Sequence, residues 1–169
     1  MAPEGGHRLT HLDERGRARM VDVGGRPVTR REATAAGWVR ISAEAADAVA
    51  AGQLTKGDVL AVARLAGIMG AKRTPELIPL CHPVALRHVD VEAELDRAMP
   101  AIRLLARARC EDATGVEMEA LTAVAVAALT VIDMLKSVDP WARVDGVQLV
   151  AKSGGRSGAV TRPEDANAG

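Results

Sequence analysis

Four charged side chains interrupt an otherwise apolar segment, Gly115 to Ser137, which is long enough to form an extended helix. Two of them, Asp133 and Lys136, follow thirteen residues without a charge. In a helix these two side chains would lie one turn apart on the same face. Two interpretations are open. They form an ion pair near the helix C-terminus, where a lysine is favoured, or they form an acid–base pair, because a half-buried lysine can be tuned for proton transfer.

The other two charges, Glu117 and Glu119, lie near the start of the same segment. Thr114 precedes Glu117 by three residues, which is the spacing of a capping box, so Glu117 has a structural interpretation as part of a helix cap. Glu119 lies about 200° further round the helix and has no such explanation. A helix that is apolar on nearly every side is buried, so a carboxylate on it must be paired, lie at an edge, or take part in function.

Several cations outside this segment indicate a binding site for an anion. Lys56 immediately precedes a predicted helix, and Lys72 and Arg73 end it. Lys152 to Gly158 combines two cations with glycines, whose backbone can approach phosphate groups closely. The spacing is not that of a P-loop, and a stretch of this composition is also typical of a flexible tail.

Cys81 and His82 raise the question of a metal site. Two distant cysteines and one such histidine do not make a zinc site, and ligand pairs at the usual short spacing are missing. We therefore expect no metal, and we interpret His82 as a hydrogen-bonding or proton-handling group whose direction is restricted by Pro83. Because the N-terminus lacks the apolar core of a signal peptide, Cys81 and Cys110 are expected to be free thiols.

The composition excludes several function classes. The formal net charge is zero, and the chain has two Trp but neither Phe nor Tyr. A basic excess for binding phosphate backbones and aromatics for stacking on bases are both missing, so we expect no nucleic-acid partner. The longest apolar run, residues 120–132, is too short to span a bilayer. We expect a cytoplasmic protein with an aliphatic core and no membrane partner.

The apolar pattern predicts an α+β fold with the order strand, helix in two pieces, two strands, helix, strand. This is the split βαβ arrangement of ferredoxin-like folds, with an antiparallel sheet and helices packed on one face. Ser42 is predicted to cap the first helix, and Gly67 and Gly70 to mark the close approach of another element. The expected ranges are a strand at 37–41, helices from 43 to about 52 and at 57–72, a buried extended segment at 77–83, strands at 89–95 and from 102, a helix at 115–137 and a strand at 144–151.

The domain organisation expected from this pattern is a single catalytic domain over residues 12–153. Residues 1–11 and 154–169 have the composition of flexible tails, and the second is rich in Gly, Ser and Arg.

Motifs spread over the chain resemble one known family. The most specific are LIPLCHP at 77–83 and TGVEMEALT at 114–122, and they are joined by MVDV at 20–23, TRREA at 29–33, KGDV at 56–59, AKRT at 71–74, Asp133-Met134 and AKSGG at 151–155. From about Leu9 to Gly158 the chain is similar to the cyclic pyranopterin monophosphate synthases, which are the C proteins of molybdenum cofactor biosynthesis.

The resemblance implies a lyase. Its substrate would be 3',8-cyclo-7,8-dihydroguanosine 5'-triphosphate, the product of a radical GTP cyclase to which the enzyme is functionally coupled. Its products would be cyclic pyranopterin monophosphate and diphosphate. The family further implies a homohexamer, built as a trimer of dimers with active sites between subunits. It implies no cofactor, and the sequence does not indicate Mg²⁺ with the triphosphate.

The resemblance also implies roles for individual residues of this sequence. Lys56, Asp133 and Lys136 would be the catalytic group, and Glu117 would support the site. Substrate contacts would come from Leu80, Cys81, His82, Met118 and Glu119, and the phosphates would be held by Arg31, Lys72, Arg73 and Lys152.

Two features of this chain qualify that assignment. Glu119 and Asp133 would lie roughly 20 Å apart along one helix at 1.5 Å per residue, so a site assembled from different chains is expected. The family usually has Lys or Arg immediately before TGVEMEALT, whereas this chain has Ala113. That difference removes one expected phosphate contact, for which Arg109 is a candidate replacement.

Two other function classes make different predictions. A non-catalytic nucleotide-binding or regulatory oligomer, which only Ala113 favours, predicts ligand binding without turnover. A structural α+β protein with incidental ion pairs predicts that substitutions of Lys56, Asp133 and Lys136 change stability but not ligand affinity.

Overall fold

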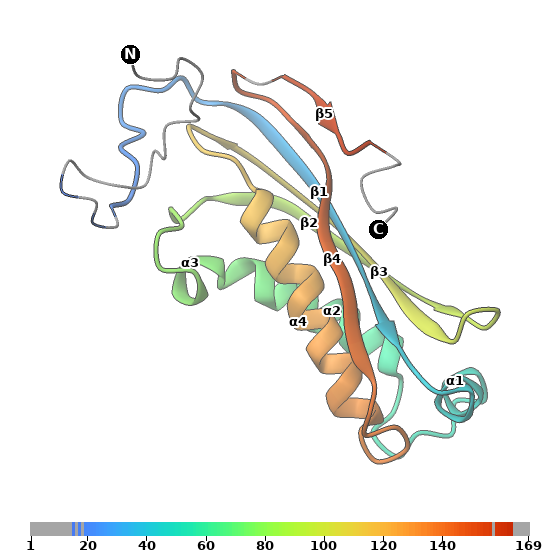
Figure 1. The fold of residues 1–169 in the computed structure, drawn as a ribbon. Helices are drawn as coiled ribbons and strands as arrows, with labels where there is room; N and C mark the ends of the chain where they lie inside the picture. The colour runs from blue at the N-terminus through green and yellow to red at the C-terminus, as the bar shows by residue number, and fades with distance from the viewer. Residues whose placement is uncertain (1–14, 16, 18, 157, 164–169) are drawn as a thin grey trace.

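The computed structural model of the chain describes residues 15, 17, 19–156 and 158–163. Within these residues a five-stranded antiparallel sheet has the order β2-β3-β1-β4-β5, and the long helices α2 and α4 lie side by side across one of its faces (Figure 1). The order of elements is that of the split βαβ unit, so the predicted α+β, ferredoxin-like fold is confirmed. The elements are β1 (Thr29–Arg40), α1 (Ala43–Ala50), α2 (Val59–Lys72), α3 (Thr74–Leu77), β2 (Leu86–Asp96), β3 (Ala101–Asp112), α4 (Glu117–Leu135), β4 (Arg143–Ser153) and β5 (Val160–Thr161).

The starts of the first two helices follow from short polar side chains. The Ser42 hydroxyl accepts a hydrogen bond from the Ala45 amide at 3.1 Å, which confirms the predicted cap of α1. Asp58 does the same for α2, where its carboxylate accepts from the Ala61 amide at 3.0 Å. Helix α2 therefore begins at Val59, and Lys56 lies in the turn just before it.

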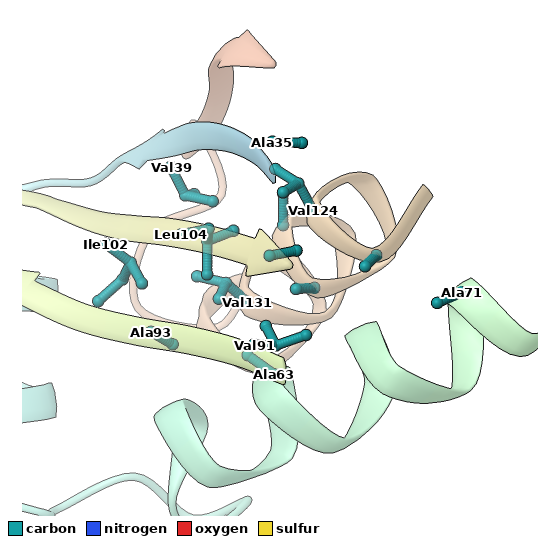
Figure 2. Close-up of a cluster of buried hydrophobic side chains, with 14 of the residues drawn as sticks. Ala35, Val39, Ala63, Ala71, Val91, Ala93, Ile102, Leu104, Val124 and Val131 are labelled. Carbon is teal, nitrogen blue, oxygen red and sulfur yellow. The ribbon is translucent and has the colours of Figure 1, made fainter. Parts of the chain in front are cut away.

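The core lies between the sheet and the helices and is built from small aliphatic side chains (Figure 2). Alanine is its commonest residue, so α2 and α4 pack very closely against each other and against the sheet. A Cβ atom at Gly67 would lie 2.9 Å from the Ala123 carbonyl oxygen, and one at Gly70 would lie 2.8 Å from the Val126 side chain. The predicted close approach at both glycines is confirmed.

Helix α4 is long and apolar enough to cross a membrane if only length and composition are counted. However, 56% of its apolar window is buried inside the domain, where α4 packs against the sheet and against α2. Burial of this extent is typical of the core helix of a globular domain.

Two local predictions are wrong. Helix α4 has Val116 at its N-cap position without a side-chain cap, so Thr114 and Glu117 do not form a capping box. The segment at 77–83 is not buried, since Leu77 is 55% exposed and Pro83 is exposed. It follows the single turn of α3, which Pro75 can begin because a proline in the first turn loses no helical hydrogen bond.

The strand boundaries also differ from the predicted ones. β1 begins at Thr29, eight residues earlier than predicted, because its buried positions Ala33 and Ala35 are too small to produce a strong strand pattern. β5 pairs with β4 through Ala151↔Thr161 and Lys152↔Val160, within the segment for which no element was predicted. Residues 1–11 lie outside the described residues.

Candidate functional site

Lys56, Asp133 and Lys136 meet at the C-terminal end of α4. The Lys136 ammonium donates to Asp133 Oδ1 at 2.6 Å, and the Lys56 ammonium donates to Asp133 Oδ2 at 2.9 Å. Lys56 also donates to the Asp133 backbone carbonyl at 2.6 Å. One carboxylate thereby joins the turn before α2 to the C-terminal end of α4, and we call these three residues the Lys–Asp–Lys cluster. The predicted ion pair of Asp133 and Lys136 is present, and Lys56 extends it.

The electrostatics of this cluster fix the state of its carboxylate. Hydrogen bonds from Lys136 and then from Lys56 lower the pKa of Asp133 to about 2. The Asp133 carboxylate is therefore ionised at neutral pH and is a weak base. In the free chain it holds two ammonium groups together in solvent, since all three side chains are between 41% and 61% exposed.

A hollow of about 760 Å³ lies beside the cluster, between α1 and the end of α4. It is lined by Thr55, Ser137 and Val138, which neighbour the cluster residues in sequence, and by Glu44 and Asp47 of α1. The cluster thus adjoins open space that a ligand or another chain can occupy.

At the opposite end of α4 a second pocket, of about 500 Å³, lies where β1 starts and where β3 and β4 end. Because β1 is antiparallel to both β3 and β4, the first residues of β1 and the last residues of β3 and β4 lie at the same end of the sheet. We call it the basic pocket. It is lined by Arg26, Pro27, Thr29, Arg31, Glu32, Ala113, Thr114, Gly115, Val116, Glu117, Lys152, Ser153, Gly154, Gly155 and Arg156.

Three residues predicted for the site meet in the basic pocket. The Lys152 ammonium donates to Glu117 Oε1 at 3.1 Å, so Glu117 orients a lysine instead of capping the helix. The Arg31 guanidinium donates to the backbone carbonyls of Asp112 and Ala113 at 3.3 and 3.2 Å. Both cations are therefore held in fixed positions around the start of α4.

The glycines after β4 allow the backbone to pass close to Arg31. Gly154 and Gly155 have φ angles of +97° and +67°, which other residues adopt only with strain. A Cβ atom at Gly154 would collide with the Arg30 carbonyl oxygen, and one at Gly155 would collide with the Arg31 guanidinium. The predicted glycine-rich stretch therefore forms one wall of the basic pocket, from Lys152 to Arg156.

Glu119 lies in the first turn of α4 and is buried, with an exposed fraction of 1%. Its Oε1 accepts from the Cys81 thiol at 3.7 Å, while its Oε2 has no hydrogen-bond partner in the described part of the chain. Burial raises the pKa of Glu119. Burial, together with the charge of Glu119, raises the pKa of Cys81 to about 11, so this thiol is a hydrogen-bond donor and not a thiolate nucleophile.

His82 is fixed by the backbone. Its Nε2 lies 2.7 Å from the carbonyl oxygen of Val21, so Nε2 carries a proton, and Nδ1 has no partner among the described residues. The predicted hydrogen-bonding role of His82 is confirmed. Leu80 and Met118, which were predicted to contact substrate, are both partly exposed.

Lys72 and Arg73 lie at the C-terminal end of α2, and both side chains are exposed. Neither appears in the lining of the basic pocket, and neither forms a hydrogen bond or ion pair through its side chain in the described part of the chain. Arg109, the candidate replacement for a basic residue at position 113, is paired with Glu32 at 3.0 Å and does not line the pocket.

Of the cations that line the basic pocket, sequence reasoning missed Arg26, and it noted Arg156 only as one of the two cations in the glycine-rich stretch at 152–158. Arg26 lies in a turn before β1, and Arg156 follows the two glycines after β4. Their positions beside Gly24-Gly25 and Gly154-Gly155 were a signal, because glycine-rich turns carrying a cation are typical of anion sites.

The predicted site residues thus gather at two places and not at one. The fourteen residues between Glu119 and Asp133 span roughly 20 Å of helix at 1.5 Å per residue, and Figure 1 shows the two ends of α4 at opposite ends of the sheet. The predicted free state of Cys81 and Cys110 is confirmed. In the described part of the chain three or more metal-binding side chains do not gather anywhere.

A ferredoxin-like domain with a lysine–aspartate cluster at one end and a basic pocket at the other has the groups of an enzyme that acts on a phosphorylated small molecule. A model of the MoaC family matches residues 20–155. A protein of Roseiflexus sp. (strain RS-1) is 59% identical over 150 residues, which cover 89% of this chain and 95% of that protein. A protein of Thermomicrobium roseum is 57% identical, over 93% of this chain and 95% of that protein. A protein of Chloroflexus aurantiacus is 56% identical, over 95% of this chain and 98% of that protein. All three are named cyclic pyranopterin monophosphate synthase.

The chain belongs to the MoaC family. It is an enzyme, a lyase of molybdenum cofactor biosynthesis, and the resemblance found in the sequence is confirmed.

Proposed function

We propose that the protein converts 3',8-cyclo-7,8-dihydroguanosine 5'-triphosphate to cyclic pyranopterin monophosphate with release of diphosphate. The observation that carries the proposal is the Lys–Asp–Lys cluster, in which Lys56 and Lys136 share the Asp133 carboxylate. The names of the relatives support the same reaction.

The chemistry of this reaction suits the groups present. Rearranging a purine-derived ring into a pterin needs repeated proton transfers, which lysine ammonium groups can carry out when a carboxylate positions them. Closing the cyclic phosphate requires a sugar hydroxyl to attack the α-phosphorus while the bond to the β-phosphate breaks. Cations must then stabilise the departing diphosphate. Lys56, Asp133 and Lys136 serve the first task, and no metal or organic cofactor is needed for it.

The basic pocket serves the phosphates. Arg31 and Lys152 line it, and their fixed positions favour a charged ligand because little side-chain freedom remains to be lost. Lys72 and Arg73, which are exposed at the C-terminal end of α2, complete the phosphate-binding set. Glu119, Cys81, His82, Leu80 and Met118 contact the ring system.

One active site takes its two halves from different subunits of a homohexamer, a trimer of dimers. The separation of roughly 20 Å between Glu119 and Asp133 along one helix supports this arrangement. Apolar side chains left exposed on the outer faces of α2 and α4 support it further, since a face of this kind is typical of a subunit interface. They are Val62, Leu65, Met69 and Leu129, at 40%, 60%, 47% and 62% exposure.

The protein works in the cytoplasm, where the radical GTP cyclase supplies its substrate. Incubation with that intermediate and measurement of the pterin product and of diphosphate tests the function, and a wild-type protein that forms neither would contradict it. We expect Lys56→Ala and Lys136→Ala to lower kcat by about 100-fold or more.

The reaction rate is expected to be unchanged in the presence of a metal chelator. Light scattering of the purified protein should give the mass of a hexamer.

A further inference from the structure

The face of the sheet that points away from α2 and α4 carries charged side chains from β1, β2 and β3 (Figure 1). Side chains at alternate positions of a strand point to opposite faces, and the buried positions of these strands belong to the core under the helices. On the other face, arginines of β3 form ion pairs across the strands. Arg107 binds Glu92 of β2, and Arg109 binds Glu32 of β1.

One row of this face departs from that pattern. Glu94, Arg103 and Trp38 are cross-strand neighbours on β2, β3 and β1. The Arg103 guanidinium lies over the Trp38 ring, 5.9 Å from the ring centre, and does not pair with Glu94. Glu94 is exposed, and its carboxylate forms neither a hydrogen bond nor an ion pair in the described part of the chain. A cross-strand Glu–Arg pair is thus left open at this row.

A pocket of about 370 Å³ lies at this row, and we call it the sheet pocket. It is lined by Trp38, Glu94, Leu95, Asp96, Arg97 and Arg103. Two of its charges are already engaged within the chain. Arg97 is paired with Asp47 at 2.8 Å, and Asp96 accepts hydrogen bonds from two amides of its own turn. The volume is at the lower end of the range for small-molecule sites, which suits a single bicyclic ring.

The groups left for a ligand are a carboxylate, a guanidinium and an indole. Guanine matches all three. Its N1–H and 2-amino groups form a donor edge for the Glu94 carboxylate, and its O6 and N7 are the acceptors that an arginine such as Arg103 binds in pairs. Its flat ring can stack on the half-buried Trp38. Adenine matches poorly, because its N1 is an acceptor and would face the carboxylate.

We propose that the sheet pocket is a separate binding site for the guanine ring of a nucleoside or nucleotide. Glu94 binds the donor edge of the ring, Arg103 binds its acceptors, and Trp38 stacks on its face. The exposed apolar residues of α2 and α4 lie on the other side of the sheet, so assembly through them leaves this pocket open. The site takes no part in the reaction proposed above, and the inference does not depend on that reaction.

Trp38 itself reports binding, because the chain has one other tryptophan, Trp141, which is 87% exposed. Trp141→Phe is therefore expected to keep the fold and to leave Trp38 as the only source of tryptophan fluorescence. In this protein guanosine should quench the fluorescence saturably, with a Kd on the order of 0.1 mM. Guanosine is the probe because it brings no phosphate for the basic pocket. Adenosine is expected to bind about tenfold more weakly or worse.

Glu94→Gln and Arg103→Gln, made in the same protein, are each expected to raise the Kd for guanosine about tenfold, the value of one charge-assisted hydrogen bond. Glu111→Gln is the matched control, since it removes the same charge from an exposed position of β3 outside the pocket and should leave the Kd unchanged. Thermal melting should show that all of these variants are folded.

Steady-state kinetics with the cyclised nucleotide separate this pocket from the site of the reaction. Glu94→Gln should keep the wild-type kcat and KM while it loses guanosine binding. Equal Kd values for guanosine and adenosine would overturn the inference, and so would wild-type Kd values in Glu94→Gln and Arg103→Gln. If wild type forms no product but guanosine binding still depends on Glu94, the sheet pocket stands and the proposed function fails.

Discussion

At the scale of single residues, Asp133 shows how two lysines can be held at one point in solvent. Its carboxylate accepts from both ammonium groups, and these hydrogen bonds lower its pKa to about 2. A pKa below the ordinary value means that the carboxylate stabilises the folded state at pH values above about 4. That contribution disappears as the pH falls towards 2.

We therefore expect Asp133→Asn to be less stable than wild type at pH 7, with the difference closing between pH 4 and pH 2. Urea unfolding midpoints of both proteins across this range are the measurement. Activity at neutral pH should fall by about 100-fold, because the two lysines lose the group that positions them. A stability difference that is constant with pH would show that the carboxylate charge is not responsible.

Glu119 presents the opposite case, a carboxyl group whose pKa is raised by burial. One of its oxygens has no partner in the described part of the chain, and the residue is only 1% exposed. A raised pKa in the folded state means that ionisation of this group costs stability once the pH rises above its ordinary range near 4.5.

The substitution Glu119→Gln should accordingly stabilise the protein at pH 7, because it removes a negative charge whose burial is unfavourable. The gain should be smaller at pH 4, which lies below the ordinary range of the group, because the wild-type carboxyl is then uncharged in the folded state as well. Chemical unfolding at the two pH values tests it. Glu119→Ala is the contrasting variant, since the cavity it leaves and the unpaired Cys81 thiol should lower stability at both pH values.

At the scale of elements, the distance between α2 and α4 is set by glycine. Gly67→Ala would place a Cβ atom 2.9 Å from a backbone carbonyl of α4, which cannot move away as a side-chain end could. Alanine normally favours a helix over glycine by about 1 kcal/mol, yet we expect this variant to be destabilised by about 1–3 kcal/mol through overpacking. Thermal unfolding gives the sign.

Ala61→Gly supplies the comparison on the same helix. Ala61 is exposed, so only helix propensity is lost, and a cost of about 1 kcal/mol is expected. If Gly67→Ala were instead stabilising, the two helices would not be in the close contact described.

Much of this arrangement could be predicted from sequence because periodicity and caps are local. Ser42 and the two glycines of α2 were interpretable from their neighbours alone, and the charges of α4 stood out against apolar residues. The role of Glu117 could not be predicted, because its spacing from Thr114 is also that of a capping box. Lys152, its actual partner, lies at the end of β4 and is far away in sequence. Arg26 was missed for the same reason, since the antiparallel pairing of β1 with β4 brings the turn before β1 to the segment that follows β4.

At the scale of the whole molecule, the exposed apolar face of α2 and α4 is the expected subunit contact. Leu65→Glu should replace the predicted hexamer by smaller species in light scattering and should lower activity by about tenfold or more, because each site would lose its second half. Met99→Glu is the control. Met99 is 55% exposed in the β2–β3 turn and does not belong to this face, so mass and activity should both be retained.

The alanine-rich core has a consequence for how the protein should melt. Small side chains bury little apolar area each, and burial of apolar area is the main source of folding free energy. In the proposed hexamer, contacts between subunits are therefore expected to contribute part of the stability of each subunit. The melting temperature should then depend on dilution, rising by several degrees between about 1 and 100 µM protein in calorimetry. A subunit that is stable by itself would melt at the same temperature at every protein concentration. This chain should instead melt at a lower temperature when it is dilute.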